Sequence, residues 1–405
     1  MIINSDSIIC LLSLLLYLCP ITNNIENMDA PFVYGRIAEN QNFTDREKET
    51  ELLLQNFSNL INTIIISPRR WGKTSLVNKV AQHLSNNKEN IYVCQVDIFN
   101  CRTEEQFYKV YANTVLKAST NAWEEFVTAA KKYLGRLVPI ISLSDSSQNY
   151  EFTFGIDFKD TKFSFDEILD LPETIAKETG KKIIVCIDEF QNINEYEDSL
   201  GFQQKLRSHW QKHTSVGYCL YGSKRHMLLN IFNNYEMPFY KFGDILFLQK
   251  IGKEDWMRFI AGRFSDTKKS ISRELCGMIT DLTKNHPYYT QQLGQQVWLR
   301  TTKNCTKEIV DEAFYGLIGQ LSLLFTNILD SLTPKQISFL IAAANKETNF
   351  SSKEVLTKYQ LGTSANIKNL KKATLEKDLI DIVSENKIEI QDPIFEYWLK
   401  NIYNK

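Results

Sequence analysis

The alternation of apolar and polar positions divides the chain into three parts, of which the first is the longest. Between positions 45 and 221, short apolar segments alternate with amphipathic segments of helical period. The predicted strands are 63–66, 91–98, 183–187 and 217–221, and the predicted helices are 45–61, 73–84, 104–116, 122–134, 165–178 and 202–213. Strands that alternate with helices predict a parallel sheet wrapped by helices, and the all-apolar strand 63–66 predicts cover on both of its faces.

Two details of this first part carry separate expectations. The helix that starts near position 45 has Thr44 or Asp45 as its candidate N-cap, because either side chain accepts a hydrogen bond from the first turn. Segment 139–163 is rich in Ser, Asp, Asn and β-forming residues, which indicates an insertion or a hairpin.

The other two parts have different patterns. After position 253 the strand pattern disappears, and helices are predicted at 253–264, 272–283, 287–301 and 307–329. The order that follows is typical of a winged helix-turn-helix: helices 335–344, 352–359 and 364–377, strands 380–383 and 387–391, and helix 394–402. We therefore predict an α/β protein with a parallel-sheet core at 28–250, an all-helical lid at 251–331 and a winged helix at 332–405.

Composition adds a few constraints. The 405 residues are 43% hydrophobic, enough for the buried cores of two or three domains. Lys and Arg number 47 against 48 Asp and Glu, so no overall field attracts nucleic acid or a membrane, and such a contact needs a local patch. The eight cysteines include no C-x-x-C pair, which indicates free, buried thiols and a cytoplasmic location.

The strand that ends at Ile66 runs into the segment SPRRWGKTS, at positions 67–75. In the pattern G-x-x-x-x-G-K-[ST], backbone N–H groups of the loop and of the following helix surround the phosphates of a nucleotide. Lys73 is then placed to reach the β- and γ-phosphates, and the Thr74 hydroxyl to bind Mg²⁺. Ser67 stands where the pattern has its first glycine. If that position is left-handed, its side chain costs about 1–2 kcal/mol.

A second motif lies more than 100 residues later, where the buried strand 183–187 ends in Asp188 and Glu189. An apolar strand that ends in two acids is the Walker B arrangement. Asp188 is expected to hold Mg²⁺ through water, and Glu189 to polarise the attacking water as a general base. Together the two motifs predict a site for ATP and Mg²⁺ between the sheet and the lid.

These motifs resemble those of the archaeal-type ATPases, a group close to the STAND branch of the AAA+ proteins. Four matches carry the resemblance: PF-x-YG at 31–35 with FTDREKE at 43–49, PRRWGKTS at 68–75, DEFQ at 188–191, and YGS at 221–223. The segment NHPYY at 285–289 is similar to the family's lid signature, whose proline packs near adenine. Asn285 and Asp45 stand where the family has glycines.

The resemblance implies a role for each matched residue. Lys73, Glu189 and Ser223 are the catalytic candidates, with Ser223 at the position that contacts the γ-phosphate or water, and Thr74 and Asp188 hold Mg²⁺. Arg69 and Arg70 either contact phosphate or form an exposed basic loop. The expected nucleotide-binding residues are Ser67, Pro68, Arg69, Arg70, Trp71, Gly72, Lys73, Thr74, Ser75, Phe43, Asp45, Arg46 and Pro287.

The apolar run at 8–18 leaves three interpretations of residues 1–27. The run is shorter than the roughly 20 residues that span a bilayer. A signal peptide requires a Lys or Arg before such a run, and none precedes this one. Translation from Met28, a targeting segment and a packed N-terminal helix all stay open. ATP chemistry takes place inside cells, which favours a start at Met28 and makes a membrane partner the weakest expectation.

Several polar residues have a plain interpretation beside a functional one. His209 and His213 lie four apart, but no third ligand is evident, so a solvated helix face is favoured over zinc. Arg207 and Arg225 are candidates for an arginine finger, in cis or from a neighbouring subunit, although an ordinary salt bridge is favoured.

The output of the protein is less determined than its nucleotide chemistry. The predicted recognition helix 364–377 carries four lysines that can neutralise phosphates, with acids close by: Lys368, Lys371, Lys372 and Lys377 against Glu376, Asp378 and Asp381. Contact with DNA and a structural or protein-binding role both stay open, as does a homo-oligomer. The favoured function is a Mg²⁺-dependent ATPase acting as a switch or motor. The alternative is a nucleotide-gated binding protein that does not hydrolyse ATP. A fused nuclease is disfavoured because no suitable carboxylate cluster follows Leu332.

Overall fold

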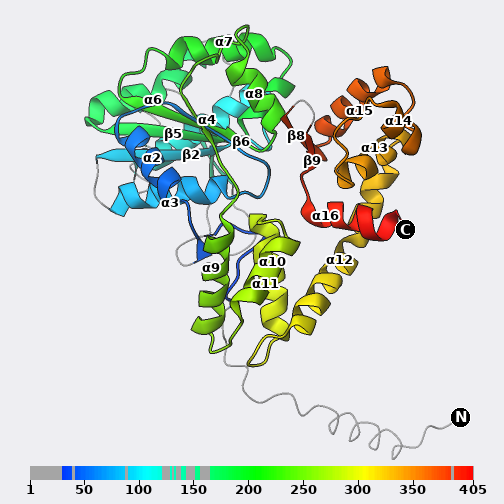
Figure 1. The fold of residues 1–405 in the computed structure, drawn as a ribbon. Helices are drawn as coiled ribbons and strands as arrows, with labels where there is room; N and C mark the ends of the chain where they lie inside the picture. Colours follow the sequence, from blue (N-terminus) through cyan, green and yellow to red (C-terminus); the bar gives the residue numbers. More distant parts are fainter. Residues whose placement is uncertain are drawn as a thin grey trace, which may run out of the picture.

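The computed structural model describes residues 30–38, 42–86, 90–120, 128–129, 132–133, 138–142, 151–155, 165–384 and 387–404. The apolar run 8–18 and most of the predicted helix 122–134 lie outside these ranges. Figure 1 shows a sheet wrapped by helices, a helical group next to it, and a C-terminal group that lies beside both.

A parallel sheet of five strands forms the centre of the first group, in the order β2-β5-β6-β1-β7. Its strands are β1 (Thr63–Ile66), β2 (Ile91–Asp97), β5 (Lys182–Asp188), β6 (Val216–Gly222) and β7 (Asp244–Phe247). β1 pairs with β6 through Ile66 and Gly222, and with β7 through Ile66 and Phe247. Every residue of β1 is buried. The predicted parallel sheet, with its covered strand, is confirmed.

Helices cover both faces of the sheet (Figure 1). They are α2 (Glu47–Ser58), α3 (Lys73–Asn86), α4 (Glu104–Ser119), α6 (Phe165–Thr179), α7 (Ser199–Trp210) and α8 (Arg225–Asn233). Alternate residues of β1 serve the two faces, since Ile65 packs into a core with α2 and α3, whereas Ile64 and Ile66 pack into a core with α4, α6 and α7. The two cores hold the end of β1, and with it the start of the phosphate loop.

Some local expectations are confirmed and others are not. The insertion contains a hairpin, because β3 (Val138–Ser142) and β4 (Glu151–Gly155) pair antiparallel. Three elements were not predicted from the sequence: α8, β7 and the 3₁₀ turn η2 (Phe190–Glu195). The prediction of a Thr44 or Asp45 cap for α2 is wrong. Arg46 takes the N-cap position, with a left-handed backbone (φ 79°) and no side-chain cap.

The lid and the winged helix share one hydrophobic core. The lid helices are α9 (Lys253–Asp266), α10 (Arg273–Leu282), α11 (Pro287–Arg300) and α12 (Lys307–Asp330). The winged helix comprises α13 (Pro334–Ala344), α14 (Lys353–Lys358), α15 (Ser364–Glu376), β8 (Ile380–Ser384), β9 (Lys387–Ile390), α16 (Pro393–Trp398) and a π-helical turn (Leu399–Tyr403). The buried carboxylate of Glu396 in α16 pairs with Lys284 (2.5 Å) and Lys346 (2.6 Å), which adds an ionic contact between the two groups. The predicted boundaries at 251 and 332 stay predictions.

Helix α12 runs from the lid to the winged helix (Figure 1). Among the described residues it is the one helix long and apolar enough to cross a membrane by length and composition. Here one side of it is packed, since Phe325 contacts Phe395 and Trp398 of the winged helix. A core helix of a soluble protein meets the same criterion, so the finding is weak evidence for a membrane span.

The cysteines of the described ranges are free thiols. Cys305 is half-buried, and the others are buried: Cys94, Cys101, Cys186, Cys219 and Cys276. Burial raises the pKa of the Cys94 thiol to about 12, so this residue stays protonated and packs as a small apolar side chain. The prediction of free thiols is confirmed for these six, with Cys305 less buried than expected.

Candidate nucleotide-binding site

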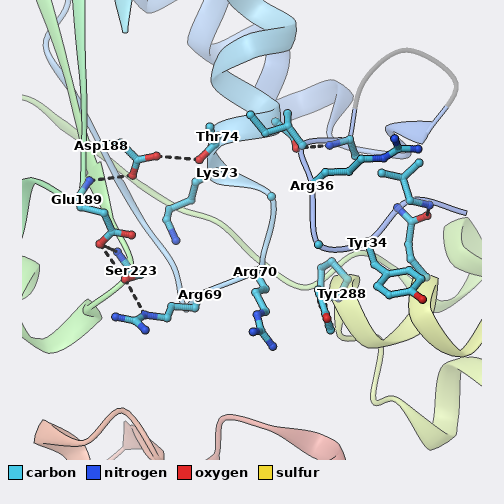
Figure 2. A pocket seen from close by; sticks show the side chains of 18 of the residues that line it. Tyr34, Arg36, Arg69, Arg70, Lys73, Thr74, Asp188, Glu189, Ser223 and Tyr288 are labelled. Carbon is cyan, nitrogen blue, oxygen red and sulfur yellow. Dashed lines mark hydrogen bonds between the residues drawn. The ribbon is translucent and has the colours of Figure 1, made fainter. Parts of the chain in front are cut away.

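The carboxyl ends of three adjacent strands meet at one edge of the sheet, where parallel sheets bind their ligands. β1 leads into the phosphate loop, β5 ends in Asp188, and β6 ends in Gly222, directly before Ser223. They open into a pocket of about 570 Å³ that the lid also borders (Figure 2). Its lining residues are Val33, Tyr34, Gly35, Arg36, Ile37, Ala38, Arg69, Arg70, Gly72, Lys73, Thr74, Ser75, Phe99, Asp188, Glu189, Ser223, Pro287, Tyr288 and Gln291.

Lys73 is held inside the phosphate loop. Its Nζ donates to the carbonyl oxygens of Ser67 (3.1 Å) and Pro68 (2.9 Å), and only 6% of the residue is exposed. Burial lowers the pKa of Lys73 to about 8, although Glu189 and Asp188 raise it. A phosphate group supplies the negative charge that such a buried ammonium lacks, so the site favours an anion at this position.

The backbone of the loop explains why serine is tolerated at position 67. The left-handed residues of the loop are Arg70 (φ 63°) and Gly72 (φ 88°), whereas Ser67 is not among the residues with positive φ. The cost considered for a left-handed Ser67 therefore does not arise. The strain falls on Arg70 instead, where a non-glycine residue in this region costs about 1–2 kcal/mol.

Two oxygen ligands suited to Mg²⁺ lie next to the loop. Thr74 Oγ1 donates to Asp188 Oδ2 at 2.9 Å, across the gap between α3 and β5 (Figure 2). Burial raises the pKa of Asp188 to about 6, the Thr74 hydrogen bond lowers it, and the charge of Glu189 raises it. A cation bound beside this buried carboxylate would stabilise its ionised form. Mg²⁺ commonly takes one or two protein oxygens together with phosphate and water oxygens, so the pair fits this ion.

Glu189 is the acid that points into the pocket beside Ser223 (Figure 2). Its Oε2 accepts from Ser223 Oγ (2.9 Å), from Ser223 N (3.3 Å) and from the side-chain amide of Gln191. Its backbone is left-handed, with φ 56°. Gly222 makes this approach possible, because a Cβ there would lie 1.8 Å from Gln191 Oε1 and 3.3 Å from Glu189 Cα.

Both arginines of the loop are exposed, and each contacts a neighbouring side chain. Arg69 Nε donates to Ser223 Oγ at 3.1 Å, so it already contacts the end of β6. The Arg70 guanidinium carbon lies 4.4 Å from the ring centre of Tyr288 in the lid. Both side chains line the pocket.

The opposite end of the pocket is formed by the N-terminal segment and α11. Gln291 of α11 accepts from Val33 N (2.9 Å) through its side-chain oxygen, which ties the two together. Tyr34 and Tyr288 meet edge to face, with ring centres 5.8 Å apart, and Pro287 lines the pocket beside them. Asn285 has a left-handed backbone (φ 57°), the conformation that a glycine supplies and that asparagine tolerates.

The entry segment at 43–49 supports the loop from outside the pocket. Arg46 is 2% exposed and donates to Glu49 (3.0 Å) and to the carbonyl of Trp71 (3.3 Å). Phe43 carries the ammonium of Lys79 over its ring, at 4.4 Å. Asp45, the departure from glycine, is also left-handed (φ 59°).

The structure therefore divides the expected site residues into two sets. The first lines the pocket: Arg69, Arg70, Gly72, Lys73, Thr74, Ser75, Asp188, Glu189, Ser223 and Pro287. The second does not: Ser67, Pro68, Trp71, Phe43, Asp45 and Arg46. Several lining residues were not among the expected binding residues: Arg36, Ile37, Ala38, Phe99 and Gln291, and also Tyr34 and Tyr288, which lie inside the matched segments 31–35 and 285–289. Phe99 follows β2 at the same edge of the sheet, which could have marked it, whereas Arg36 to Ala38 carry no recognisable pattern.

Four other candidates have local partners. The expectation that His209 and His213 form a solvated helix face is wrong, because their side chains are 13% and 3% exposed and both contact Asp170 Oδ1. Among the described residues no group of three or more His, Cys, Asp or Glu side chains could hold a metal ion. Arg207 packs its guanidinium over Phe242, and Arg225 forms a salt bridge with Asp381 (2.6 Å).

Comparison with known proteins agrees with this geometry. Residues 71–197 match the KAP family P-loop domain, and residues 323–401 match a family described as "Probable winged helix domain". The chain contains a P-loop NTPase domain. The first matched region starts inside the phosphate loop and ends after η2, so it includes both Lys73 and Glu189. No curated protein sequence matches the chain.

Solved structures extend the likeness in fold to nearly the whole chain. A Walker-type ATPase of Pyrococcus abyssi, 18% identical, has a TM-score of 0.65 and covers 91% of this chain and 99% of its own. The ORC2 protein of Aeropyrum pernix, in ADPNP–ADP complexes, is 14% identical with a TM-score of 0.55, over 92% and 96% of the two chains. The expected archaeal-type P-loop ATPase fold, with its C-terminal winged helix, is confirmed. Membership of the STAND branch stays a prediction.

Proposed function

We propose that this chain is a Mg²⁺-dependent ATPase that binds ATP between the sheet and the helical lid. The observation that carries the proposal is the hydrogen bond between Thr74 and Asp188 in a pocket that also contains Lys73, Glu189 and Ser223. A P-loop lysine, a hydroxyl–carboxylate pair and a second carboxylate are the groups that phosphoryl transfer to water requires. In this proposal the phosphates lie along the loop from Arg69 to Ser75.

Mg²⁺ would be held by Thr74 and Asp188, and it would neutralise charge on the phosphates. Lys73 would bind the β- and γ-phosphates, exchanging its contacts to loop carbonyls for phosphate oxygens. The adenine would lie at the end formed by Tyr34, Pro287 and Tyr288, whose rings offer apolar surface.

Glu189 would act as the general base, because its carboxylate faces the pocket and lies next to Ser223. Ser223 would orient the water or the γ-phosphate through its hydroxyl. The carboxylate must first exchange at least one of its present donors, Ser223 and Gln191, for the water that it polarises. This exchange makes the basal rate slow.

The same hydrogen bonds support a second candidate, a nucleotide-gated switch that binds ATP and does not hydrolyse it. Its output would pass through the winged helix to DNA or to a protein partner. The exposed Lys368 and Lys372 on α15 support the DNA option. We also propose a cytoplasmic location, where ATP is available, and leave a homo-oligomer as a further option of the same proposal.

The test combines ATP binding with phosphate release by the full chain. Lys73→Ala is expected to abolish both, whereas Glu189→Gln is expected to keep binding and lose release by about 10²–10⁴-fold. Glu195→Gln is a matched control, because Glu195 lies at the far end of η2, is half-exposed and pairs with Arg102. Binding without release in the wild type supports the switch. A folded wild-type protein that binds no nucleotide contradicts both candidates.

A further inference from the structure

The turn between α15 and β8 lies against the nucleotide pocket through ionic contacts. In Figure 2 the winged-helix ribbon, in pale red, passes the side of the pocket where Arg69 and Arg70 lie. Arg69 Nη2 lies 4.0 Å from Asp378 Oδ2, and Arg225 Nη1 lies 2.6 Å from Asp381 Oδ2. Two carboxylates of the winged helix therefore face two arginines of the NTPase core.

Arg69 contacts the catalytic groups and the winged helix at the same time. Its Nε donates to Ser223 Oγ, which in turn donates to Glu189 Oε2. Its side chain is 55% exposed and lines the pocket, so it has room to reorient. The planar guanidinium offers several donors on different edges, which allows one arginine to serve both neighbours.

Asp378 is presented to this region by a defined turn. Its backbone is left-handed (φ 56°), its amide donates to the Leu375 carbonyl at 2.9 Å, and its side chain is only 19% exposed. Burial raises the pKa of Asp378, Arg69, His226 and Lys224 lower it, and Glu189 raises it. The carboxylate thus lies near three basic side chains, of which Arg69 lines the same pocket as Glu189.

From this juxtaposition we propose that Asp378 and the γ-phosphate of ATP compete for Arg69, so that ATP, and not ADP, releases the winged helix from the pocket. The inference rests on the proposed ATP site. Arginine binds phosphate through short, charge-assisted hydrogen bonds. A γ-phosphate also brings negative charge towards Asp378. ADP has no γ-phosphate, so it leaves the Asp378 contact in place.

The second ion pair transmits the release. Arg225 begins α8 and lies two residues after Ser223, so a shift of Ser223 towards a γ-phosphate also moves the partner of Asp381. Loss of both pairs frees the α15–β8 turn and the β8–β9 hairpin for other contacts. A ligand that binds only the released form best shifts the equilibrium towards that form.

The test measures ATP and ADP affinity in the full chain carrying Glu189→Gln, which keeps ATP intact. Adding Asp378→Asn is expected to tighten ATP binding by about 5-fold or more and to change ADP binding by less than about 2-fold. Glu376→Gln is the matched control, because this exposed acid lies two residues before Asp378 and pairs with Lys372, and the substitution is expected to change neither affinity.

A second measurement uses no substitution at Asp378. Hydrogen exchange of residues 378–384 is expected to be faster with ATP than with ADP, in the Glu189→Gln protein. Equal exchange in the two states, or equal shifts of ATP and ADP affinity in Asp378→Asn, overturns the inference while the proposed ATP site stands. A Glu189→Gln protein that binds neither nucleotide overturns the proposed function and this inference with it.

Discussion

Gly222→Ala tests how tightly the end of β6 is packed against the catalytic acid. The added Cβ would lie 1.8 Å from Gln191 Oε1, so the amide has to turn away. Gln191 is 1% exposed, and its amide nitrogen donates to Glu189, so the movement breaks that hydrogen bond. The Glu189 Cα, 3.3 Å from the same Cβ, is backbone and yields less easily.

The magnitude follows from these contacts. A hydrogen bond to a charged group contributes about 1.5–3 kcal/mol, and an extra methyl group in a packed region costs about 1–3 kcal/mol. We expect the free energy of unfolding of the NTPase core to fall by about 2–4 kcal/mol. Because Glu189 is displaced from its present position, we also expect ATP hydrolysis to fall at least about 10-fold.

Urea unfolding and phosphate release measure the two effects, in a double-mutant cycle with Gln191→Ala. Removing the Gln191 side chain makes room for the new methyl group, so Gly222→Ala should cost much less stability in that background. The same cost in both backgrounds would refute the clash. Gly319→Ala in α12 is the control, because its Cβ meets nothing within 4 Å and a helical alanine stabilises by up to about 1 kcal/mol.

Three further substitutions test the supports of the site and the contact between the lid and the winged helix. Arg46→Gln removes the buried donor to the phosphate loop, and we expect a loss of about 1–3 kcal/mol and weaker ATP binding; an unchanged urea midpoint would contradict this role. Burial lowers the pKa of His286 to about 3, so between pH 6.5 and 3 only the unfolded chain takes up its proton and stability falls as pH falls. The slope is at most about 1.4 kcal/mol per pH unit. His286→Asn should flatten it in urea titrations, and an unaltered slope would exclude His286 as its source. Glu396→Gln leaves its two lysines without their carboxylate, and we expect about 1–2 kcal/mol lower stability, where Glu389→Gln, more exposed, should change little.

Much of the fold follows from local sequence, because the period of apolar residues reports which faces are buried. The four strands 63–66, 91–98, 183–187 and 217–221 were predicted within about two residues, as were most helices of the lid and the winged helix. The strand β7 was not predicted, because its segment is half-exposed and becomes a strand only through its pairing with β1. The N-cap of α2 was predicted wrongly, because that helix starts at a residue held by buried contacts, Arg46, and not at a capping side chain.

The chemistry of the phosphate site was also readable from the sequence, since the backbone of a short loop places Lys73 and Thr74 together. The placement of Asp188 and Glu189 beside this loop could also be predicted, because the carboxyl ends of parallel strands lie at one edge of the sheet. By contrast, Arg36, Phe99 and Gln291 enter the pocket from segments far apart in the chain. The contact of Asp378 with Arg69 joins positions 309 residues apart, 378 against 69. No local pattern encodes such a pair, because it depends on how the winged helix packs against the core, which only tertiary structure decides.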